Sequence, residues 1–533
     1  MNGKGLALAT SGLVVLGGAA VWLFRGTSVA PAGDARGAQV LSPPRTPSAP
    51  AYYQCPDTSM YPVFSATIPG DASPRITSQD AADCYAWWEL ITLNWPTTPG
   101  AGFGDPGDLS PVQWQTWVTD SQLFPPSSQR AAKATPALAS DSCAAEAGID
   151  AVRARKLPLL SATTKFHTAG DEVFGPGQFD EAAPSNGPSW LASQNGHNVW
   201  YEVHVSPDEQ QFVAGNQFQN ANAQWSYVTG DGGVTLNDAG APVGSGGHAF
   251  NLPEGQANGA VGAVETKAAW METDDPGNAK WQSYKLTSAI VIDPSTSKCR
   301  AATLALVGLH ILHKTASQAS WVWATFEHVM NVPGSTIVDG GVPPDGGFNF
   351  YNPICDAQTV TVSPSCVPDG GTGSVSVGCA PNVSPPYYLG PGCAPVPIQV
   401  TRTTPIDGVA ARQTLAAWAA IQAAYPASVW RNYQLVNVIW SSSAGEASGP
   451  IPVPLPLNSM QPTAVVANTT LETYAQTTTC TQCHVYATIA RSTADCDPVW
   501  NSDVSFLMSQ ASIPGGGCTA ARSQAVLHSR KRN

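Results

Sequence analysis

Charged side chains are scarce in this chain: Asp, Glu, Lys and Arg make up 12% of its 533 residues. So low a charged fraction excludes a coiled coil and a charged disordered chain. The formal net charge of −13 makes the protein a poor binder of polyanions, so we expect no nucleic-acid partner. The 49 glycines and 46 prolines indicate a loop-rich globular protein, long enough for a large core and more than one domain.

The motifs of several common enzyme classes are also missing. The sequence has no phosphate-binding loop and no dinucleotide fingerprint. It has no Gly-x-Ser-x-Gly elbow, since the nearest run, Gly244–Gly247, has the wrong spacing and follows no strand. These absences leave nucleotide-dependent and serine-hydrolase functions without support.

One stretch present in the sequence indicates a specific cofactor. Cys480-Thr481-Gln482-Cys483-His484 is a C-x-x-C-H run, the pattern that attaches haem c to a polypeptide. Two thiols at this spacing can each add to a haem vinyl group and form a thioether. The adjacent histidine then lies under the iron as its proximal ligand. The run predicts one covalent haem c held by Cys480, Cys483 and His484.

Other interpretations of the same run are half of a zinc site, a redox-active CxxC, or two structural cysteines beside a histidine. A structural zinc site normally needs a second pair of ligands at similar spacing. The sequence contains no second CxxC and no HxxxH. Haem c is therefore the preferred prediction.

The run resembles the haem-attachment site of c-type cytochromes, and the resemblance implies thioethers at Cys480 and Cys483 and iron ligation by His484. Several stretches elsewhere are similar to a group of exported bacterial haem-c proteins of unknown activity. These are residues 92–96, 267–270, 308–310, 325–328 and 467–469. Small cytochromes c carry most of their helical body after the motif, whereas only 49 residues follow His484 here. We therefore expect the haem to sit partly against the large upstream body.

The ligand opposite His484 decides between electron transfer and reaction at an open iron site. Met508 is a candidate, because it follows His484 by 24 residues on a predicted helix, although core packing also explains it. His310, His313 and His328 are the other candidates. If residues 308–314 form a strand, His310 and His313 point to opposite faces, so at most one can face the iron.

The N-terminus predicts export. Lys4 precedes an uncharged run, Gly5–Phe24, which is closed by Arg25. About twenty helical residues can cross a bilayer core, so we expect residues 1–25 to be an uncleaved anchor, with a cleaved signal peptide as the alternative. Either form places the body outside the bacterial cytoplasm, in the periplasm or at the cell surface, where haem c is attached and disulfides persist.

Ten cysteines remain outside the haem run, an even number that predicts up to five disulfides without fixing their pairing. A Cys496–Cys518 bridge would close the haem segment, and pairing with the main body is the alternative. The remaining cysteines are Cys55, Cys84, Cys143, Cys299, Cys355, Cys366, Cys379, Cys393, Cys496 and Cys518.

The predicted fold class is α+β, with a mainly antiparallel sheet body, flanking helices and a small helical C-terminal haem c segment. The expected divisions are a linker (26–51), the body (52–448), a Cys/Gly/Pro-rich insertion within it (334–395), a proline-rich connector (449–464), the haem segment (465–520) and a polar, basic tail (521–533). Helices are predicted over 77–95, 110–124, 264–273 and 410–425, and in the haem segment from Thr469, over 485–491 and from Ser502. Strands are predicted over 200–205, 286–293, 303–314, 321–329 and 433–441.

These features predict an extracytoplasmic monohaem c-type cytochrome that transfers electrons with a redox partner protein or a small-molecule oxidant or reductant. The sequence has one haem-attachment motif and no other recognisable group of catalytic residues, which favours electron transfer. A haem-dependent peroxidase or oxygenase with an open distal site is the first alternative. Electron transfer alone needs only ~100 residues around a haem, an ordinary domain size, and this chain of 533 residues has enough left over to build a substrate pocket. A disulfide-stapled binding protein without haem is the second. Whether the chain is an enzyme stays open, and the sequence predicts no oligomeric state.

Overall fold

A computed structural model of the chain describes residues 64–125 (except 74), 141–161, 191–230, 235–236, 242–243, 247–293 (except 258), 298–334, 347–361 (except 357), 374–383, 395–442, 449–492 (except 458) and 500–513. All of them belong to one compact unit, Val40–Asn533. The predicted anchor, the linker and the C-terminal tail lie outside the described residues. No helix in the described ranges has the length and apolar character needed to cross a membrane.

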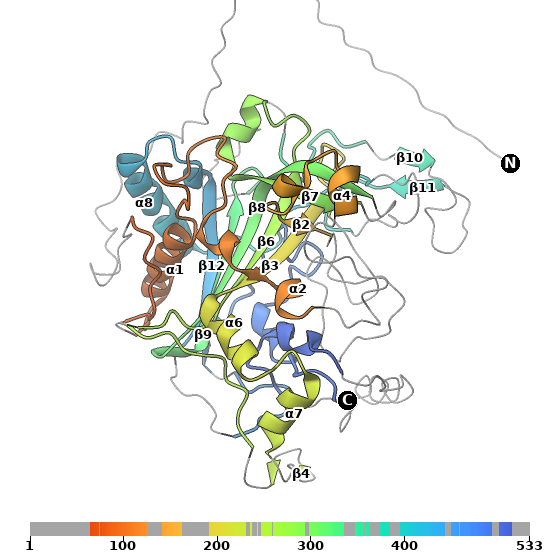
Figure 1. Cartoon of the computed structure of the whole chain (residues 1–533). Coiled ribbons are helices and arrows are strands. Elements are labelled where there is room, and N and C mark those ends of the chain that lie inside the picture. Colours follow the sequence, from red (N-terminus) through yellow and green to blue (C-terminus); the bar gives the residue numbers. More distant parts are fainter. Residues whose placement is uncertain are drawn as a thin grey trace, which may run out of the picture. The chain divides into compact units, whose positions relative to one another are not determined.

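A nine-stranded sheet forms the centre of the body (Figure 1). Its main order is β1-β3-β6-β8-β9-β12-β13, with β7 paired to β8 and β2 paired to β7. All pairs are antiparallel except β2–β7. The strands are β1 (Val118–Thr119), β2 (Leu159–Leu160), β3 (Val199–Val205), β6 (Val264–Glu272), β7 (Leu286–Ile292), β8 (Cys299–Thr315), β9 (Gln318–His328), β12 (Tyr433–Ser441) and β13 (Met460–Gln461). The predicted α+β class with a mainly antiparallel sheet is confirmed.

The predicted helix over 264–273 is wrong, because these residues form the central strand β6. Both edges of β6 are hydrogen-bonded, to β3 and to β8, and all nine of its residues are buried. The adjacent alanines, Ala268 and Ala269, favour a helix locally. Pairing on both sides outweighs that preference, since strand formation depends strongly on neighbouring strands.

Two long helices, α1 (Gln79–Leu93) and α8 (Gly408–Ala424), pack side by side against one face of the sheet, next to β12 (Figure 1). Ser78 caps α1 by accepting from Ala81 N at 3.2 Å, and Asp407 caps α8 in the same way. The helices predicted over 77–95 and 410–425 are confirmed.

The helix predicted from Ser110 is wrong in its extent. The segment forms a 3-10 turn, η2 (Gln113–Thr116), then β1 and a short helix, α2 (Asp120–Leu123). Pairing of Val118 and Thr119 with β3 breaks the helix in two, and Thr119 begins the second piece with a capping box to Gln122. Among the described residues, the body also contains α4 (Asp141–Glu146), α5 (Ala151–Ala154), α6 (Pro207–Gly215), α7 (Ala221–Thr229), η3 (Ala279–Ser283) and η5 (Val429–Asn432).

Two disulfides join described cysteines, Cys143–Cys299 and Cys355–Cys379. The second lies in the predicted insertion, next to a two-stranded sheet of β10 (Gln358–Thr361) and β11 (Ser374–Val377). A further small sheet pairs β4 (Thr235–Leu236) with β5 (Pro242–Val243). Cys496 and Cys518, with the bridge predicted between them, lie outside the described residues.

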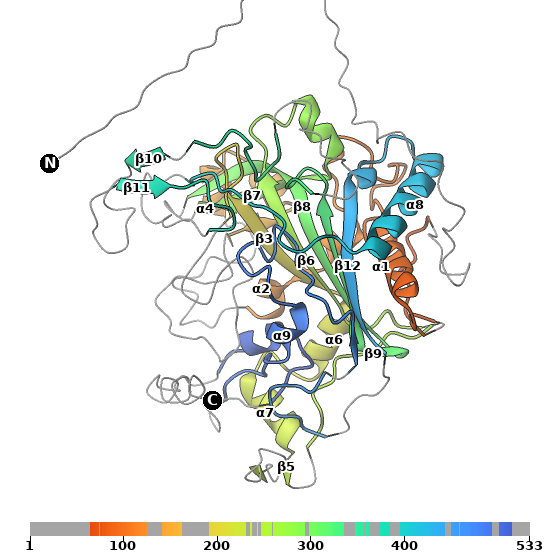
Figure 2. The ribbon, with the colours of Figure 1, turned by 180° about the vertical axis from the view of Figure 1, so that it is seen from behind.

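The other face of the sheet is covered by the C-terminal stretch, residues 466–492 and 500–513, blue in Figure 2. Its helices are α9 (Cys480–His484) and η6 (Phe506–Gln510), joined by turns and bridges. Polar contacts fasten it to the strands: Asn468 Nδ2 donates to Thr325 Oγ1 at 3.0 Å, and Tyr201 Oη donates to Thr470 O at 3.0 Å.

Two predicted helices in this stretch are wrong, and the third is shorter than predicted. Residues after Asn468 form a closed turn, because Asn468 N donates to the Glu472 carboxylate at 2.7 Å and Glu472 N donates back to Asn468 O at 2.9 Å. After His484 the chain makes one further turn, in which Ala487 N donates to His484 O at 3.0 Å, and no helix follows, since Thr488 bridges Asn501. The helix expected from Ser502 is the 3-10 turn η6, which Ser505 caps.

Candidate functional site

The two cysteines and the histidine of the C-x-x-C-H run project from one face of the helix α9. Cys480 and Cys483 are three residues apart and His484 is four residues from Cys480, so all three lie on neighbouring helical positions. Thr479 N donates to Gln482 Oε1 at 3.0 Å and starts the helix, while the Gln482 side chain is exposed. The thiols and the imidazole are half-buried.

A backbone carbonyl orients the His484 ring. Its Nδ1 lies 2.8 Å from Val504 O, so Nδ1 carries the proton and donates it to the carbonyl. In a neutral imidazole this leaves the lone pair on Nε2, the nitrogen that can bind iron. Histidines that ligate metals almost always donate their other ring N–H to such an acceptor. His484 therefore has the tautomer and the support that a proximal ligand requires.

Two aromatic rings flank His484. Trp323 on β9 meets the imidazole edge to face, with ring centroids 4.8 Å apart and an interplanar angle of 90°. Phe506 on η6 lies with its centroid at 4.8 Å and an angle of 59°. The indole comes from the upstream body, so the motif rests partly on that body. That a haem would sit against the body as well stays a prediction.

The carbonyl that orients His484 belongs to an unusual turn. Asp503 and Val504 have φ values of +57° and +63°, in the left-handed region that β-branched residues rarely enter. Asp503 N donates to Asn501 Oδ1 at 2.7 Å, and Asn501 Nδ2 donates to Ala487 O at 3.1 Å. Consecutive left-handed residues redirect the chain, and the result is that Val504 O points at His484.

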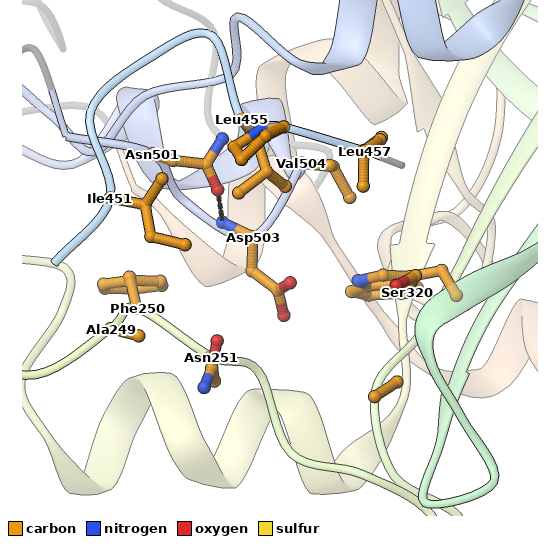
Figure 3. A pocket seen from close by; sticks show the side chains of 13 residues that line it. Ala249, Phe250, Asn251, Ser320, Ile451, Leu455, Leu457, Asn501, Asp503 and Val504 are labelled. Atoms are coloured by element: carbon orange, nitrogen blue, oxygen red, sulfur yellow. Dashed lines mark hydrogen bonds between the residues drawn. The ribbon is translucent and has the colours of Figure 1, made fainter. Parts of the chain in front are cut away.

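A cavity of about 280 Å³ adjoins this turn. Asp503 and Val504 form part of its wall, opposite Phe250 and Asn251, and Figure 3 shows the Asp503 carboxylate directed into it. The volume lies just below the usual range of small-molecule pockets, ~300–1,000 Å³. The turn thus touches both the cavity and the histidine.

Met508, the first predicted distal ligand, is fully buried on η6. Its side chain belongs to an apolar cluster that includes Trp321, Trp500 and Leu507, and Cys480 packs against the same cluster. Its backbone carbonyl accepts from Gln224 Nε2 at 3.0 Å. Core packing accounts for this burial, and ligation of iron by Met508 stays a prediction.

His310 and His313 point to opposite faces of β8, as predicted. His310 faces the C-terminal stretch, where its Nε2 lies 3.3 Å from Glu472 Oε1. His313 faces α1, where Nδ1 lies 2.6 Å from Glu89 Oε1 and Nε2 lies 2.7 Å from Val261 O. His310 is thus on the face that carries α9, and its role as a distal ligand stays a prediction.

His328 is held as a structural residue. Its ring stacks on Tyr284, with centroids 3.7 Å apart, and both nitrogens have partners, Ser283 O at 3.1 Å and Met330 N at 3.2 Å. Burial lowers the pKa of His328 to about 3, so the ring stays neutral.

The groups that support His484 outside the motif have no clear signal in the sequence. Val504 acts through its backbone carbonyl, which no side-chain pattern reveals. Asp503 falls at the start of the helix predicted from Ser502, and Lys314 falls in the strand predicted over 303–314, 189 residues away. The alternation of Trp321 and Trp323 in a strand is the one signal that places the flanking indole on a common face.

Comparisons of the chain with protein-family models, with curated proteins and with solved structures found no match. Within the described ranges, no three His, Cys, Asp or Glu side chains gather as a metal site. Function must therefore be inferred from the motif and the geometry around it.

Proposed function

We propose that this chain is an extracytoplasmic monohaem c-type cytochrome that transfers electrons. The observation that carries the proposal is the His484 imidazole, whose Nδ1 donates to Val504 O at 2.8 Å beside two thiols on the same helical face. This arrangement combines the attachment chemistry of the motif with the tautomer needed for ligation through Nε2.

The residues present fit a haem c. When bound, the haem supplies an iron that accepts and releases one electron. Cys480 and Cys483 would hold the porphyrin through thioethers, and His484 would ligate the iron through Nε2. Trp323 and Phe506 shield the imidazole from water and limit its rotation. With a haem bound, these contacts would hold the His484 ring in one orientation.

The half-buried position of α9 favours electron transfer. None of the residues Cys480–His484 is fully buried, and Gln482 is exposed. A haem attached there would have an edge close to the surface, where a redox partner can approach. The net charge of −13 suits a partner with a basic surface.

The location outside the cytoplasm is part of the same proposal. Disulfides persist mainly in oxidising compartments, and the structure pairs Cys143 with Cys299 and Cys355 with Cys379. Covalent attachment of haem c takes place in the same compartment. The predicted anchor, residues 1–25, would tether the protein to the membrane there.

The test is covalent haem in protein made by a host competent to attach it. We expect haem peroxidase staining of the wild-type band on a denaturing gel, and none with Cys480→Ala/Cys483→Ala. The matched control, Cys355→Ala/Cys379→Ala, removes two cysteines elsewhere and should keep the stain. An unstained wild-type band would refute the proposal.

The absorption spectrum then separates electron transfer from haem enzymology. A low-spin spectrum in both oxidation states is expected for two strong axial ligands. A high-spin spectrum, with carbon monoxide binding to the ferrous form, would instead favour a peroxidase or oxygenase. Met508→Ala changes the low-spin spectrum only if Met508 is the second ligand.

A further inference from the structure

The turn that carries the Val504 carbonyl is braced by a buried ion pair with the central strand β8, which the C-terminal stretch covers. Lys314 Nζ on β8 donates to Asp503 Oδ2 at 2.5 Å, and Leu252 N donates to the same oxygen at 2.8 Å. The Lys314 side chain has no exposed surface, and that of Asp503 is 9% exposed. A buried charge pair with additional hydrogen bonds defines one geometry closely.

The turn needs such a brace. Left-handed conformations at non-glycine residues cost ~1–3 kcal/mol each, and they persist only where surrounding contacts enforce them. The contacts of Asp503 with Asn501, Leu252 and Lys314 enforce this conformation. Val504 follows directly, so the position of its carbonyl depends on the position of Asp503.

Other carboxylates make Lys314 necessary. Glu209 on α6 and Glu265 on β6 are buried, and Glu209 interacts electrostatically with both Glu265 and Asp503. Burial, followed by the charges of Glu265 and Asp503, raises the pKa of Glu209 well above its usual value. Without the lysine, Asp503 would be a buried carboxylate facing carboxyl groups, and the turn would lose its main attractive contact.

We propose that Lys314 and Asp503 are positioning residues that set the strength of the His484–Val504 hydrogen bond and thereby the reduction potential of the haem. This inference rests on the proposed function. A strong acceptor at Nδ1 increases the basicity of the imidazole and stabilises ferric iron. When the brace is lost, the carbonyl moves away, the ring becomes a weaker donor, and the ferrous state is favoured.

The first readout does not require haem. In the protein purified without haem, ¹⁵N NMR of the His484 ring should show the proton on Nδ1. In Lys314→Met and Asp503→Asn the ring should exchange between both tautomers, because the acceptor is no longer fixed. A His484 ring that keeps its Nδ1 proton in both variants overturns the brace, whatever the haem content.

The second readout is the potential of the haem-loaded protein. We expect each variant to retain covalent haem, because the thiols are untouched. The ferric-to-ferrous equilibrium constant should change about tenfold towards ferrous, which is ~59 mV for one electron. Unchanged potentials would overturn the proposal, whereas a wild type without covalent haem would overturn the proposed function and leave the tautomer result standing.

Two further variants control for folding. Lys314→Met/Asp503→Asn removes both charges, so it avoids a buried unpaired charge and should fold even if a single variant does not. It should show the same upward shift in potential. Glu89→Gln breaks the buried pair of Glu89 with His313. His313 precedes Lys314 on β8, and its side chain points to the opposite face of the sheet. Glu89→Gln should reduce stability and leave the potential and the His484 tautomer as in the wild type.

Discussion

The two faces of the central sheet are covered in different ways. On one face, α1 and α8 pack with large apolar contacts, such as Trp87 on Phe326 with ring centroids 5.2 Å apart. On the other face, the mostly non-helical C-terminal stretch is fastened by buried charges. Its pairs include Lys314–Asp503 and His310–Glu472.

The two kinds of contact contribute differently to the stability of the fold and to the geometry of the site. Apolar contact between a helix and a sheet is strong but tolerates small shifts, since it depends on area rather than direction. Hydrogen-bonded charge pairs contribute little net stability, yet they specify distances and angles. We infer that the helical face supplies most of the free energy of unfolding, and that the charged face fixes the site around His484. The helical face also includes a buried pair, Glu89–His313, which joins α1 to β8.

Removing an indole from the helical face should have the largest effect. Trp87 is fully buried on α1, so Trp87→Ala should lower the free energy of unfolding by ~3–5 kcal/mol through lost contacts and a cavity. Leu415→Ala, on α8 but 39% exposed, is the control and should change it by ~0.5 kcal/mol or less. Urea unfolding measures both. A loss below that of the control would contradict the assignment of stability to this face.

Breaking one charge pair on the other face should come next. Arg402 and Glu327 form a buried ion pair, and burial lowers the pKa of Arg402 to about 10, so it stays charged at neutral pH. Arg402→Met should cost ~3 kcal/mol, because Glu327 is left as a buried unpaired charge. Arg402→Met/Glu327→Gln should cost less than the single change. If the double variant is the less stable of the two, the pair itself contributes net stability and the comparison fails.

The two faces also differ in how well the sequence predicts their elements. The helix α8 and the strand β12 lie within two residues of their predicted bounds, because Pro426 ends the helix and β-branched residues mark the strand. The elements of the C-terminal stretch were mostly mispredicted. Its capping-box pattern at Thr469 is satisfied by a closed turn, and the residues after His484 pair with Asn501. Local patterns predict regular elements well and long-range polar contacts poorly.

The candidate site divides similarly. Cys480, Cys483 and His484 are close in sequence, and their spacing alone predicts haem attachment. The brace is not, because Lys314 and Asp503 meet across 189 residues and act through a backbone carbonyl. A lysine in a strand and an aspartate in a loop have no signature until the fold brings them together.

A buried acid on the helical face should weaken the fold as the pH rises. Burial raises the pKa of Asp83 well above its usual 3.8, with smaller contributions from Asp407 and Asp80. The folded protein therefore retains a proton that the unfolded chain loses, and stability falls as the pH rises from about 4 to the folded pKa. Asp83→Asn should remove this fall, which is ~1.4 kcal/mol per unit of pKa difference. Urea unfolding at several pH values measures it. Parallel wild-type and variant profiles would contradict a raised pKa.

The charged face should show a smaller effect of opposite sign. Burial acts to raise the pKa of Glu472, but His310, the Asn468 N–H and Lys267 outweigh it and lower the pKa below its usual 4.5. The unfolded chain then binds a proton first, so the stability contributed by Glu472 is present above pH 4.5 and is lost as the pH falls through the folded pKa. Glu472→Gln should be less stable than the wild type at neutral pH, and the difference should shrink in acid. A difference that grows in acid would mean that burial dominates at Glu472 as it does at Asp83, and the two faces would then respond to pH alike.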